Sequence, residues 1–357
     1  MRLCGLRAAF AATADADSWV LHDPRLWLGS AFHEVIQTLR SGGAQNPAEI
    51  WDTEIARAAR AAQEHPLDKR YSSPQKWPSY FLVRQRCLSM ASKAPKRKVE
   101  VKSSQVQTAL PTFVRGAERR SEARNGQLVG KPDYFDGDII TEYKSSLPNP
   151  QWEGAADIVE SFKRQLRLYA AIIADVTERW PTGARIVAAS GQALEFPISQ
   201  AECDHEADDA VAALNRLNVD LASACAPERM ANPSAPNCAG CDFKIICPAF
   251  WQSLAGGDLR AIRATAIDGV LLSVEDGPDG DLYTAKINVV ASSQAGNSEQ
   301  QIVLRESIHG ELSNSAVGGR VRVIDFNIRG DGRIRAERKT VVVATSSLPL
   351  ISVIGSG

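Results

Sequence analysis

Apolar residues recur every three to four positions through most of the first part of the chain, which is the period of a helix that buries one face. Phe32, Val35 and Ile36 show the pattern, because they fall at positions i, i+3 and i+4. The pattern predicts helices over residues 1–40, 49–63, 80–92, 155–178 and 200–224.

Shorter runs rich in β-branched and aromatic residues predict strands. In the first part of the chain they lie at 98–101, at 110–114, on both sides of a turn at 135–138, and at 184–189. After Trp251 the helical period fades, and five runs separated by glycine-containing turns follow at 261–274, 282–291, 300–306, 320–328 and 333–346. We therefore expect a mixed α/β sheet with flanking helices over residues 1–255, a small OB-like β-barrel domain over 258–346, and a tail at 347–357.

Composition narrows the class of protein. Hydrophobic residues are 44% and charged residues 23% of the chain, as in ordinary globular proteins, and the formal net charge is -1. A nucleic-acid-binding surface would therefore have to be a local basic patch. No apolar run reaches the roughly 18 residues that a transmembrane helix needs, so we expect no membrane partner.

The first 16 residues contain the small and apolar residues of a secretory signal, but Arg7 interrupts them. The odd number of cysteines, seven, does not fit a secreted disulfide framework. We therefore expect a cytoplasmic protein with reduced thiols.

An acidic hairpin is the most informative segment. If Asp136-Gly137 forms a two-residue turn, Asp133 pairs with Ile140. Because side chains alternate along a strand, Glu142 and Lys144 lie on the same face as Ile140. The sequence thus predicts that Asp133 and Glu142 are diagonal neighbours, about 7–8 Å apart between backbones, with Lys144 one step further along.

Two carboxylates beside a lysine have a chemical use. Their hard oxygens suit Mg²⁺ or Mn²⁺, and such an ion neutralises a phosphate and makes a bound water nucleophilic. A lysine beside the ion can orient the attacking water and offset charge in the transition state. The same spacing is also compatible with a solvated acidic hairpin, so the motif alone leaves both interpretations open.

Further residues change that balance. His33 lies on the first predicted helix, where its imidazole can add a nitrogen ligand, and Gln165 and Tyr169 project from one side of a later helix. Taken in order, four motifs resemble those of the RecB-like PD-(D/E)XK nucleases: Gly29-x3-His33, Gly130-x2-Asp133, Glu142-Tyr143-Lys144 and Gln165-x3-Tyr169.

The resemblance implies a restriction-endonuclease-like core and a metal-dependent DNA exonuclease that acts in repair or recombination. It implies that His33, Asp133 and Glu142 are metal ligands and that Lys144 is the catalytic lysine. Gln165 and Tyr169 then support the site and contact DNA. The sequence has no G-x4-G-K-[ST] phosphate loop, so ATP-driven unwinding would need a separate helicase.

Three cysteines late in the chain, Cys238, Cys241 and Cys247, form a C-x2-C-x5-C motif that lets three thiolates converge on one metal centre. Nucleases of the resembling family that carry an iron–sulfur cluster, AddB among them, have a fourth cysteine upstream of the histidine motif. Cys4 occupies that place, so the resemblance implies a [4Fe–4S] cluster that joins the two ends of the nuclease region.

The cysteine assignment leaves alternatives. Cys87 is a rival fourth ligand, but it falls after the histidine motif and inside a predicted helix. Zinc is an alternative metal, because four-cysteine ligand sets serve both zinc and iron–sulfur centres, and three buried but unligated cysteines are another. We expect Cys203 and Cys225 to be ordinary small apolar residues.

The function of the barrel also stays open. Arg320-Val321-Arg322-Val323 alternates basic and apolar residues, and Tyr283 and Phe326 are candidates for base stacking. Further positive charge follows at Arg333, Arg335, Arg338 and Lys339. We expect the barrel either to hold nucleic acid or to serve protein contacts and core support. For the whole chain, the alternatives to a DNA nuclease are a catalytically weak DNA-binding scaffold and an RNA-processing nuclease with structural zinc.

Overall fold

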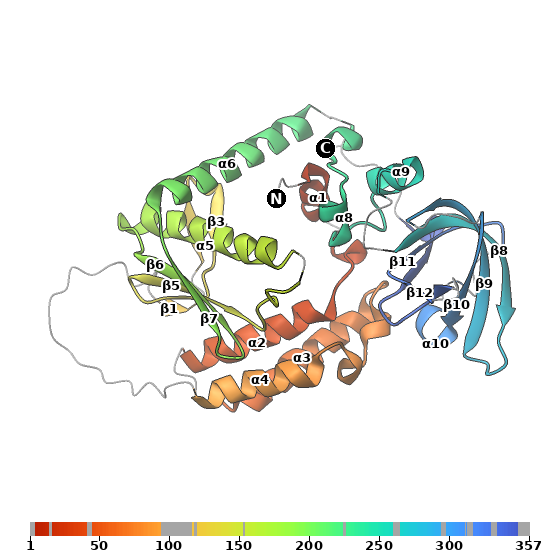
Figure 1. Cartoon of the computed structure of the whole chain (residues 1–357), viewed down its shortest axis with the longest axis horizontal. Helices are drawn as coiled ribbons and strands as arrows, with labels where there is room; N and C mark the ends of the chain where they lie inside the picture. Colours follow the sequence, from red (N-terminus) through yellow and green to blue (C-terminus); the bar gives the residue numbers. More distant parts are fainter. Residues whose placement is uncertain are drawn as a thin grey trace. The chain divides into compact units, whose positions relative to one another are not determined.

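The structure is a computed structural model (Figure 1) that describes residues 4–13, 16–40, 45–93, 116–117, 120–152, 154–223, 226–259, 265–293, 298–310, 312, 317–329 and 334–348. The expected strands at 98–101 and 110–114, Cys225, Arg333 and most of the tail lie outside these residues. The chain divides into two compact units, unit 1 (residues 1–22, 60–73 and 217–357) and unit 2 (residues 23–59 and 74–216).

The helix expected over residues 1–40 is interrupted. The structure instead has α1 (Gly5–Ala11), the 3-10 helix η1 (Ala16–Trp19) and α2 (Pro24–Arg40). Proline has no N–H to donate and its fixed φ suits the first turn of a helix, so Pro24 begins α2 and prevents it from continuing from upstream. The apolar period predicted the two helices but not the break between them.

Unit 2 contains the mixed sheet. Its strand order is β1-β4-β5-β6-β7, in which β5 and β6 are parallel and the other neighbours antiparallel. A separate two-stranded ladder is formed by β2 (Ser121–Ala123) and β3 (Leu128–Gly130). The five sheet strands are β1 (Gly116–Ala117), β4 (Tyr134–Phe135), β5 (Ile139–Lys144), β6 (Gly183–Ala188) and β7 (Ala193–Pro197).

Helix α5 (Ala155–Thr177) connects the parallel strands β5 and β6 and packs on the sheet (Figure 1). Its apolar positions Leu166, Ala170 and Ile173 follow the helical period and are all at most 1% exposed. They share a core with Ile140 of β5 and Ile186 of β6. The packing fixes which face of α5 is turned toward the sheet, and with it the polar residues beside that face.

Three more helices carry residues of unit 2: α3 (Pro47–Glu64), α4 (Tyr80–Lys93) and α6 (Gln200–Ala222), close to the predicted bounds. Helix α4 contacts α2. Cys203 of α6 is fully buried in the core of unit 2, so the prediction of an ordinary apolar cysteine is confirmed there.

Unit 1 contains a curled sheet of seven strands in the order β12-β13-β10-β9-β8-β11-β14 (Figure 1). These strands are β8 (Ala266–Asp276), β9 (Leu282–Ser292), β10 (Glu299–Arg305), β11 (Arg320–Ile324), β12 (Asn327–Ile328), β13 (Ile334–Arg335) and β14 (Val341–Ala344). The last two of the five predicted runs are each split, the fourth at Asp325, whose φ of 59° interrupts an extended strand.

One stretch of chain, residues 334–344, links the two sides of this sheet. Its start pairs in parallel with β10, and its end pairs antiparallel with β11. The strands thereby curl around a core that includes Ile287, Leu304 and Val323. The predicted small barrel-like C-terminal domain is confirmed.

The barrel shares a second core with the cysteine-bearing segment. Phe250, Trp251 and Leu254 of α9 (Pro248–Gly256) pack in one cluster with Ala266 of β8 and Val341 of β14. The same unit contains three short helices, α7 (Pro227–Met230), α8 (Ala235–Ala239) and α10 (Glu306–His309). The expected division into domains at 1–255 and 258–346 stays a prediction, because shared packing does not test which segments fold independently.

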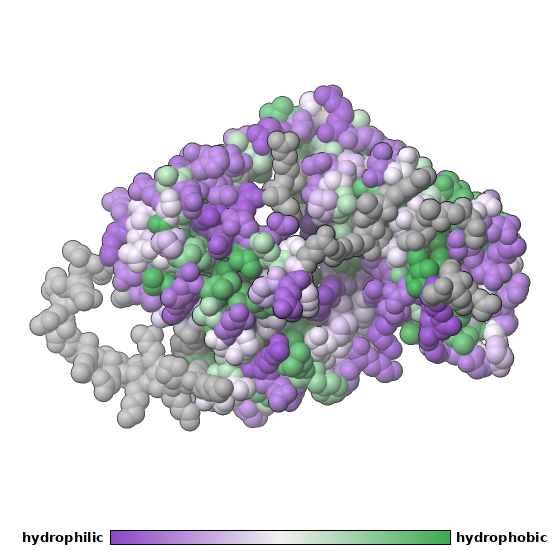
Figure 2. Space-filling view, in the orientation of Figure 1, coloured by the Kyte–Doolittle hydropathy of each residue, from purple (hydrophilic) through white to green (hydrophobic). Residues whose placement is uncertain are grey.

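The surface in view in Figure 2 is mostly hydrophilic, with apolar residues in small groups. Large exposed apolar side chains such as Phe81, Trp152 and Val219 come from separate elements. Within the described residues, the helices are too short or too polar to cross a membrane.

Candidate active site

The acidic hairpin forms with a register two positions away from the expected one. Phe135 pairs with Ile140 and Tyr134 with Thr141, so the connection is longer than a two-residue turn. Asp136 holds this connection, because its Oδ1 accepts hydrogen bonds from the backbone N–H groups of Asp138 and Ile139. A shift of two preserves the face on which each side chain lies, so the expected clustering survives the change of register.

The structure brings together the six residues predicted for this site: His33, Asp133, Glu142, Lys144, Gln165 and Tyr169. His33 lies on α2, Asp133 directly precedes β4, and Glu142 and Lys144 lie on β5. Asp133 Oδ2 accepts a 2.6 Å hydrogen bond from the backbone N–H of Tyr143, which fastens the carboxylate to β5. Asp133 Oδ1 is 3.3 Å from His33 Nδ1.

Lys144 is held from two sides. Its Nζ donates to Glu142 Oε1 at 2.6 Å and to Gln165 Oε1 at 3.4 Å. Gln165 in turn donates from Nε2 to Tyr169 Oη at 2.9 Å, so the two helix residues act as one bonded pair. The predicted i, i+4 pair therefore supports the lysine through a chain of hydrogen bonds.

The electrostatics of the site are dominated by its two carboxylates. Burial and the nearby charge of Asp133 raise the pKa of Glu142 to about 7, although Lys144 opposes the shift. Burial by itself lowers the pKa of His33, but the hydrogen bond and charge of Asp133 outweigh it, so that pKa is raised. Burial and the charge of Glu142 raise the pKa of Tyr169 to about 12, which keeps the phenol protonated. The carboxylate pair therefore favours added positive charge.

One oxygen of Glu142 indicates where a positive charge could bind. Glu142 Oε2 is buried and accepts no hydrogen bond, although a buried polar atom is usually satisfied. The charges of Asp133 and His33 act on Glu142, and these two residues offer an oxygen and a nitrogen in its neighbourhood. A hard divalent cation fits this donor set, because it would satisfy the unpaired oxygen and offset the charge that raises the pKa of Glu142.

Two contacts of the site were not predicted. Lys144 Nζ lies over the ring of Phe162, 4.8 Å from its centroid, where the negative face of the ring attracts the ammonium group. Phe162 stands one helical turn before Gln165, so the i, i+3 spacing was the signal in the sequence. Gly130 packs against α5 so closely that a Cβ there would lie 2.9 Å from Tyr169 Cδ1. The motif glycine therefore sets the approach of β3 to α5.

The four cysteines predicted as cluster ligands, Cys4, Cys238, Cys241 and Cys247, line one cavity in unit 1. Burial raises the pKa of the Cys247 thiol to about 12, and the nearby sulfurs of Cys241, Cys4 and Cys238 act in the same direction. The rival Cys87 is buried on α4 in unit 2 and does not line the cavity. The fold therefore brings Cys4, which the order of the motifs favoured over Cys87, into the same cavity as the other three cysteines.

The expectation that two aromatic residues of the barrel stack bases is wrong. Tyr283 and Phe326, the candidates for base stacking, are 2% and 1% exposed, because their rings fill the barrel core. Arg320 forms a two-armed ion pair with Asp268 at 2.8 and 2.9 Å, so its charge is largely offset. Arg322 stacks over Trp251 and donates to the backbone carbonyl of Ile245.

The remaining basic residues of that region are mixed. Arg338 donates to the backbone carbonyl of Arg70, and Lys339 lies 3.9 Å from a carboxylate oxygen of Glu337. Arg335 is exposed on β13, and Arg333 lies outside the described residues. Neighbouring acids thus offset part of the positive patch that the sequence suggested.

A comparison with protein families shows a match. The model of the PD-(D/E)XK nuclease superfamily matches residues 2–248, well over half of the chain. The match spans the six clustered residues of the hairpin site and the four cysteines. A search of the curated proteins found no match.

Proposed function

This chain belongs to the PD-(D/E)XK nuclease superfamily, whose members use divalent metal ions to hydrolyse phosphodiester bonds, and from that premise we propose that it is a RecB-like deoxyribonuclease acting in DNA repair or recombination. The observation that carries the proposal is the unpaired, buried Glu142 Oε2 beside Asp133 and His33, with Lys144 bonded to the other oxygen of Glu142. A structural ion pair would not need this excess of negative charge.

Each residue has a role that follows from its contacts. Asp133, Glu142 and His33 would hold Mg²⁺ or Mn²⁺, which when bound neutralises phosphate and acidifies water. Lys144, partly exposed at 20%, orients the attacking water and offsets charge that develops on the phosphate. The lysine is positioned by Gln165, Tyr169 and Phe162. Gln165 and Tyr169 would also contact DNA.

The choice of DNA over RNA, and of exonuclease over endonuclease action, rests on the resemblance of the four motifs to RecB-like enzymes. A separate helicase would supply unwinding. RNA is the alternative substrate, and a catalytically weak DNA-binding scaffold is the alternative function. The complete set of donor and lysine side chains in contact argues against the scaffold.

The test is cleavage of labelled single- and double-stranded DNA, with an RNA of the same sequence, by anaerobically purified protein in Mg²⁺ or Mn²⁺. Asp133→Ala, Glu142→Gln and Lys144→Ala should each lower the rate by orders of magnitude, and His33→Ala should have a smaller effect. Asp138→Asn is the matched control, because this acid of the same hairpin has a 65% exposed side chain and should leave the rate unchanged.

A measurement of stability distinguishes a variant that has lost catalysis from one that has lost its fold. The pKa of Glu142 is raised to about 7 in the folded protein, so its ionisation costs stability as the pH rises through that value. Without metal at pH 8, Glu142→Gln should therefore have a melting temperature equal to or above that of the wild type. Near-normal cleavage by Asp133→Ala or Glu142→Gln would contradict the assignment of these residues as metal ligands of the active site.

For the cysteine cavity we propose an AddB-type [4Fe–4S] cluster held by Cys4, Cys238, Cys241 and Cys247. The four cysteines line one pocket, and the preference for iron over zinc rests on the resemblance to cluster-bearing nucleases. The cluster would fasten α1 to the end of the nuclease region.

Protein purified without air should be brown and contain about four iron atoms per chain. Cys4→Ser and Cys247→Ser should lose iron and melt at a lower temperature, because the cluster closes a long loop. Cys203→Ala is the control, since this buried cysteine lies in the core of unit 2 and should retain the iron. Stoichiometric zinc without iron in the anaerobic protein would refute the cluster.

A further inference from the structure

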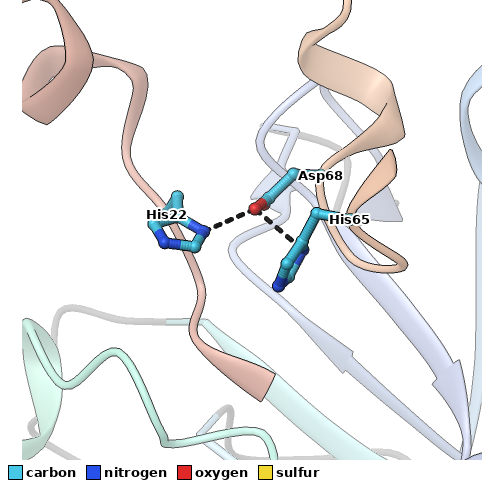
Figure 3. Close-up of side chains that lie close together, drawn as sticks. All are labelled: His22, His65 and Asp68. Atoms are coloured by element: carbon cyan, nitrogen blue, oxygen red, sulfur yellow. Dashed lines mark hydrogen bonds and ion pairs between the residues drawn. The ribbon is translucent and has the colours of Figure 1, made fainter. Parts of the chain in front are cut away.

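A second group of metal-ligand side chains lies in unit 1, outside the residues discussed so far. It consists of His22, His65 and Asp68 (Figure 3). His22 lies between η1 and α2, and the other two lie between α3 and the 3-10 helix η2 (Lys69–Tyr71). One ligand atom from each residue lies within 4.8 Å of the other two.

A carboxylate oxygen stands between the two imidazole rings (Figure 3). Asp68 Oδ2 is 2.6 Å from His22 Nδ1 and 2.9 Å from His65 Nδ1. The Asp68 side chain is fully buried, and its Oδ1 makes no hydrogen bond. Arg70 Nη1 is 3.6 Å from that oxygen, too far for a hydrogen bond. Only the long ion pair with Arg70 reaches Oδ1, so the hydrogen bonding of this buried carboxylate is incomplete.

The hydrogen bonds of His65 identify what is missing. Its Nε2 lies 2.5 Å from the backbone carbonyl of Asp17, which can only accept, so Nε2 carries the proton. Its Nδ1 accepts a hydrogen bond from the N–H of Leu67 at 3.2 Å, so Nδ1 has a lone pair in the plane of the ring. That nitrogen nevertheless faces the carboxylate of Asp68 at 2.9 Å. Two lone pairs at this distance repel unless a cation lies beside both.

We propose that His22, His65 and Asp68 bind one divalent transition-metal ion of the zinc class. Two imidazole nitrogens and a carboxylate oxygen are ligands that zinc prefers, and water would complete the coordination. The bond from His65 Nε2–H to the Asp17 carbonyl is the outer contact that orients a metal-binding histidine. Zinc ligands at about 2.0–2.1 Å stand about 3.3 Å apart, so binding would move Asp68 Oδ2 away from the two nitrogens by about 0.4 to 0.7 Å.

The ion would be structural. His22 and Asp68 are 46 positions apart, and they belong to the first and second of the three segments that build unit 1. An ion held by both would fasten the segment after α1 to the segment after α3. It would bind to side chains that take no part in the proposed nuclease site.

The test measures zinc directly. Full-length protein is made anaerobically in an Asp133→Asn background, which weakens the proposed active-site metal, then dialysed against excess zinc and freed of unbound ion. Zinc per chain is measured for the background protein, for His22→Gln, for His65→Gln and for His205→Gln. His205 is the matched control, because its side chain on α6 is 76% exposed.

The background protein and His205→Gln should each hold one zinc more than His22→Gln and His65→Gln, and zinc should raise the melting temperature only of the first two. With cobalt(II) in place of zinc, the extra site should absorb without a sulfur-to-cobalt band, which separates it from the cysteines. Circular dichroism checks folding, and His22→Gln changes a partly exposed side chain. Equal zinc content in all four proteins would overturn the proposal and leave a shared proton as the missing cation.

Discussion

At the scale of single residues, burial decides the protonation of His309. Burial and the charges of Arg70 and Arg305 lower its pKa to about 4, against hydrogen bonds that act in the other direction. Its Nδ1 accepts from the backbone N–H of Arg305, and its Nε2 donates to the carbonyl of Glu337. Each ring nitrogen is thus matched to the neutral form, in which one donates and the other accepts.

This neutral histidine predicts acid sensitivity. Because its pKa is about 4 when folded and about 6.5 when unfolded, the unfolded state takes up the proton first, so stability is lost as the pH falls from 6.5 to 4. His309→Gln should remove about 2 kcal/mol of the stability difference between pH 7 and pH 5. Urea unfolding at both pH values measures it, with His205→Gln as the exposed control. An unchanged pH dependence in His309→Gln would contradict the assignment.

At the scale of elements, the approach of β3 to α5 depends on a residue without a side chain. A Cβ at Gly130 would lie 2.8 Å from Ile172 Cδ1 and 2.9 Å from Tyr169 Cδ1. Gly29, the glycine of the first motif, lies in α2, and a Cβ added there would point into open space. The two motif glycines therefore have different physical roles.

Gly130→Ala should lose about 1–3 kcal/mol of stability from overpacking and should lower the cleavage rate by displacing Tyr169. Gly29→Ala should instead be neutral or gain up to about 1 kcal/mol from helix propensity. Chemical unfolding and the nuclease assay measure both variants. Equal stability of the two variants would show that the ring of Tyr169 moves aside without cost.

At the scale of the whole molecule, the barrel is part of the core that surrounds the cysteines. Ala266, Ile324 and Val341 of the barrel pack with Phe250 and Trp251 of α9. Burial of each such large side chain contributes about 1.5–3 kcal/mol to the free energy of unfolding. The loss of several of them would therefore approach the total stability of a domain. Support of the cysteine-bearing segment is therefore the role that we favour for the barrel.

Truncation after Leu254 should accordingly lower the melting temperature and promote aggregation rather than only weaken DNA binding. The exposed Arg335→Ala should leave both DNA affinity and its salt dependence unchanged. Thermal unfolding and DNA titration at several salt concentrations measure these effects. A truncated protein with normal stability and reduced DNA affinity would instead make the barrel an independent DNA-binding domain.

Features that depend on local backbone geometry could be predicted from the amino-acid sequence alone. The period of two along a strand put Glu142 and Lys144 on one face, and an error of two in register left that face unchanged. The helical period predicted α3, α5 and α6, and the family resemblance of the motifs and cysteines selected residues that the fold brings together. These features need no knowledge of which distant segments meet.

Which polar groups lack hydrogen bonds and which charges are offset could not be predicted without the folded structure. The buried oxygens of Glu142 and Asp68 lack hydrogen bonds because of how several segments pack around them. Asp268 neutralises Arg320 across two strands that are 52 positions apart, and the barrel core buries Tyr283 and Phe326. Desolvation and pairing are properties of the assembled environment, which is set by long-range contacts that no local pattern encodes.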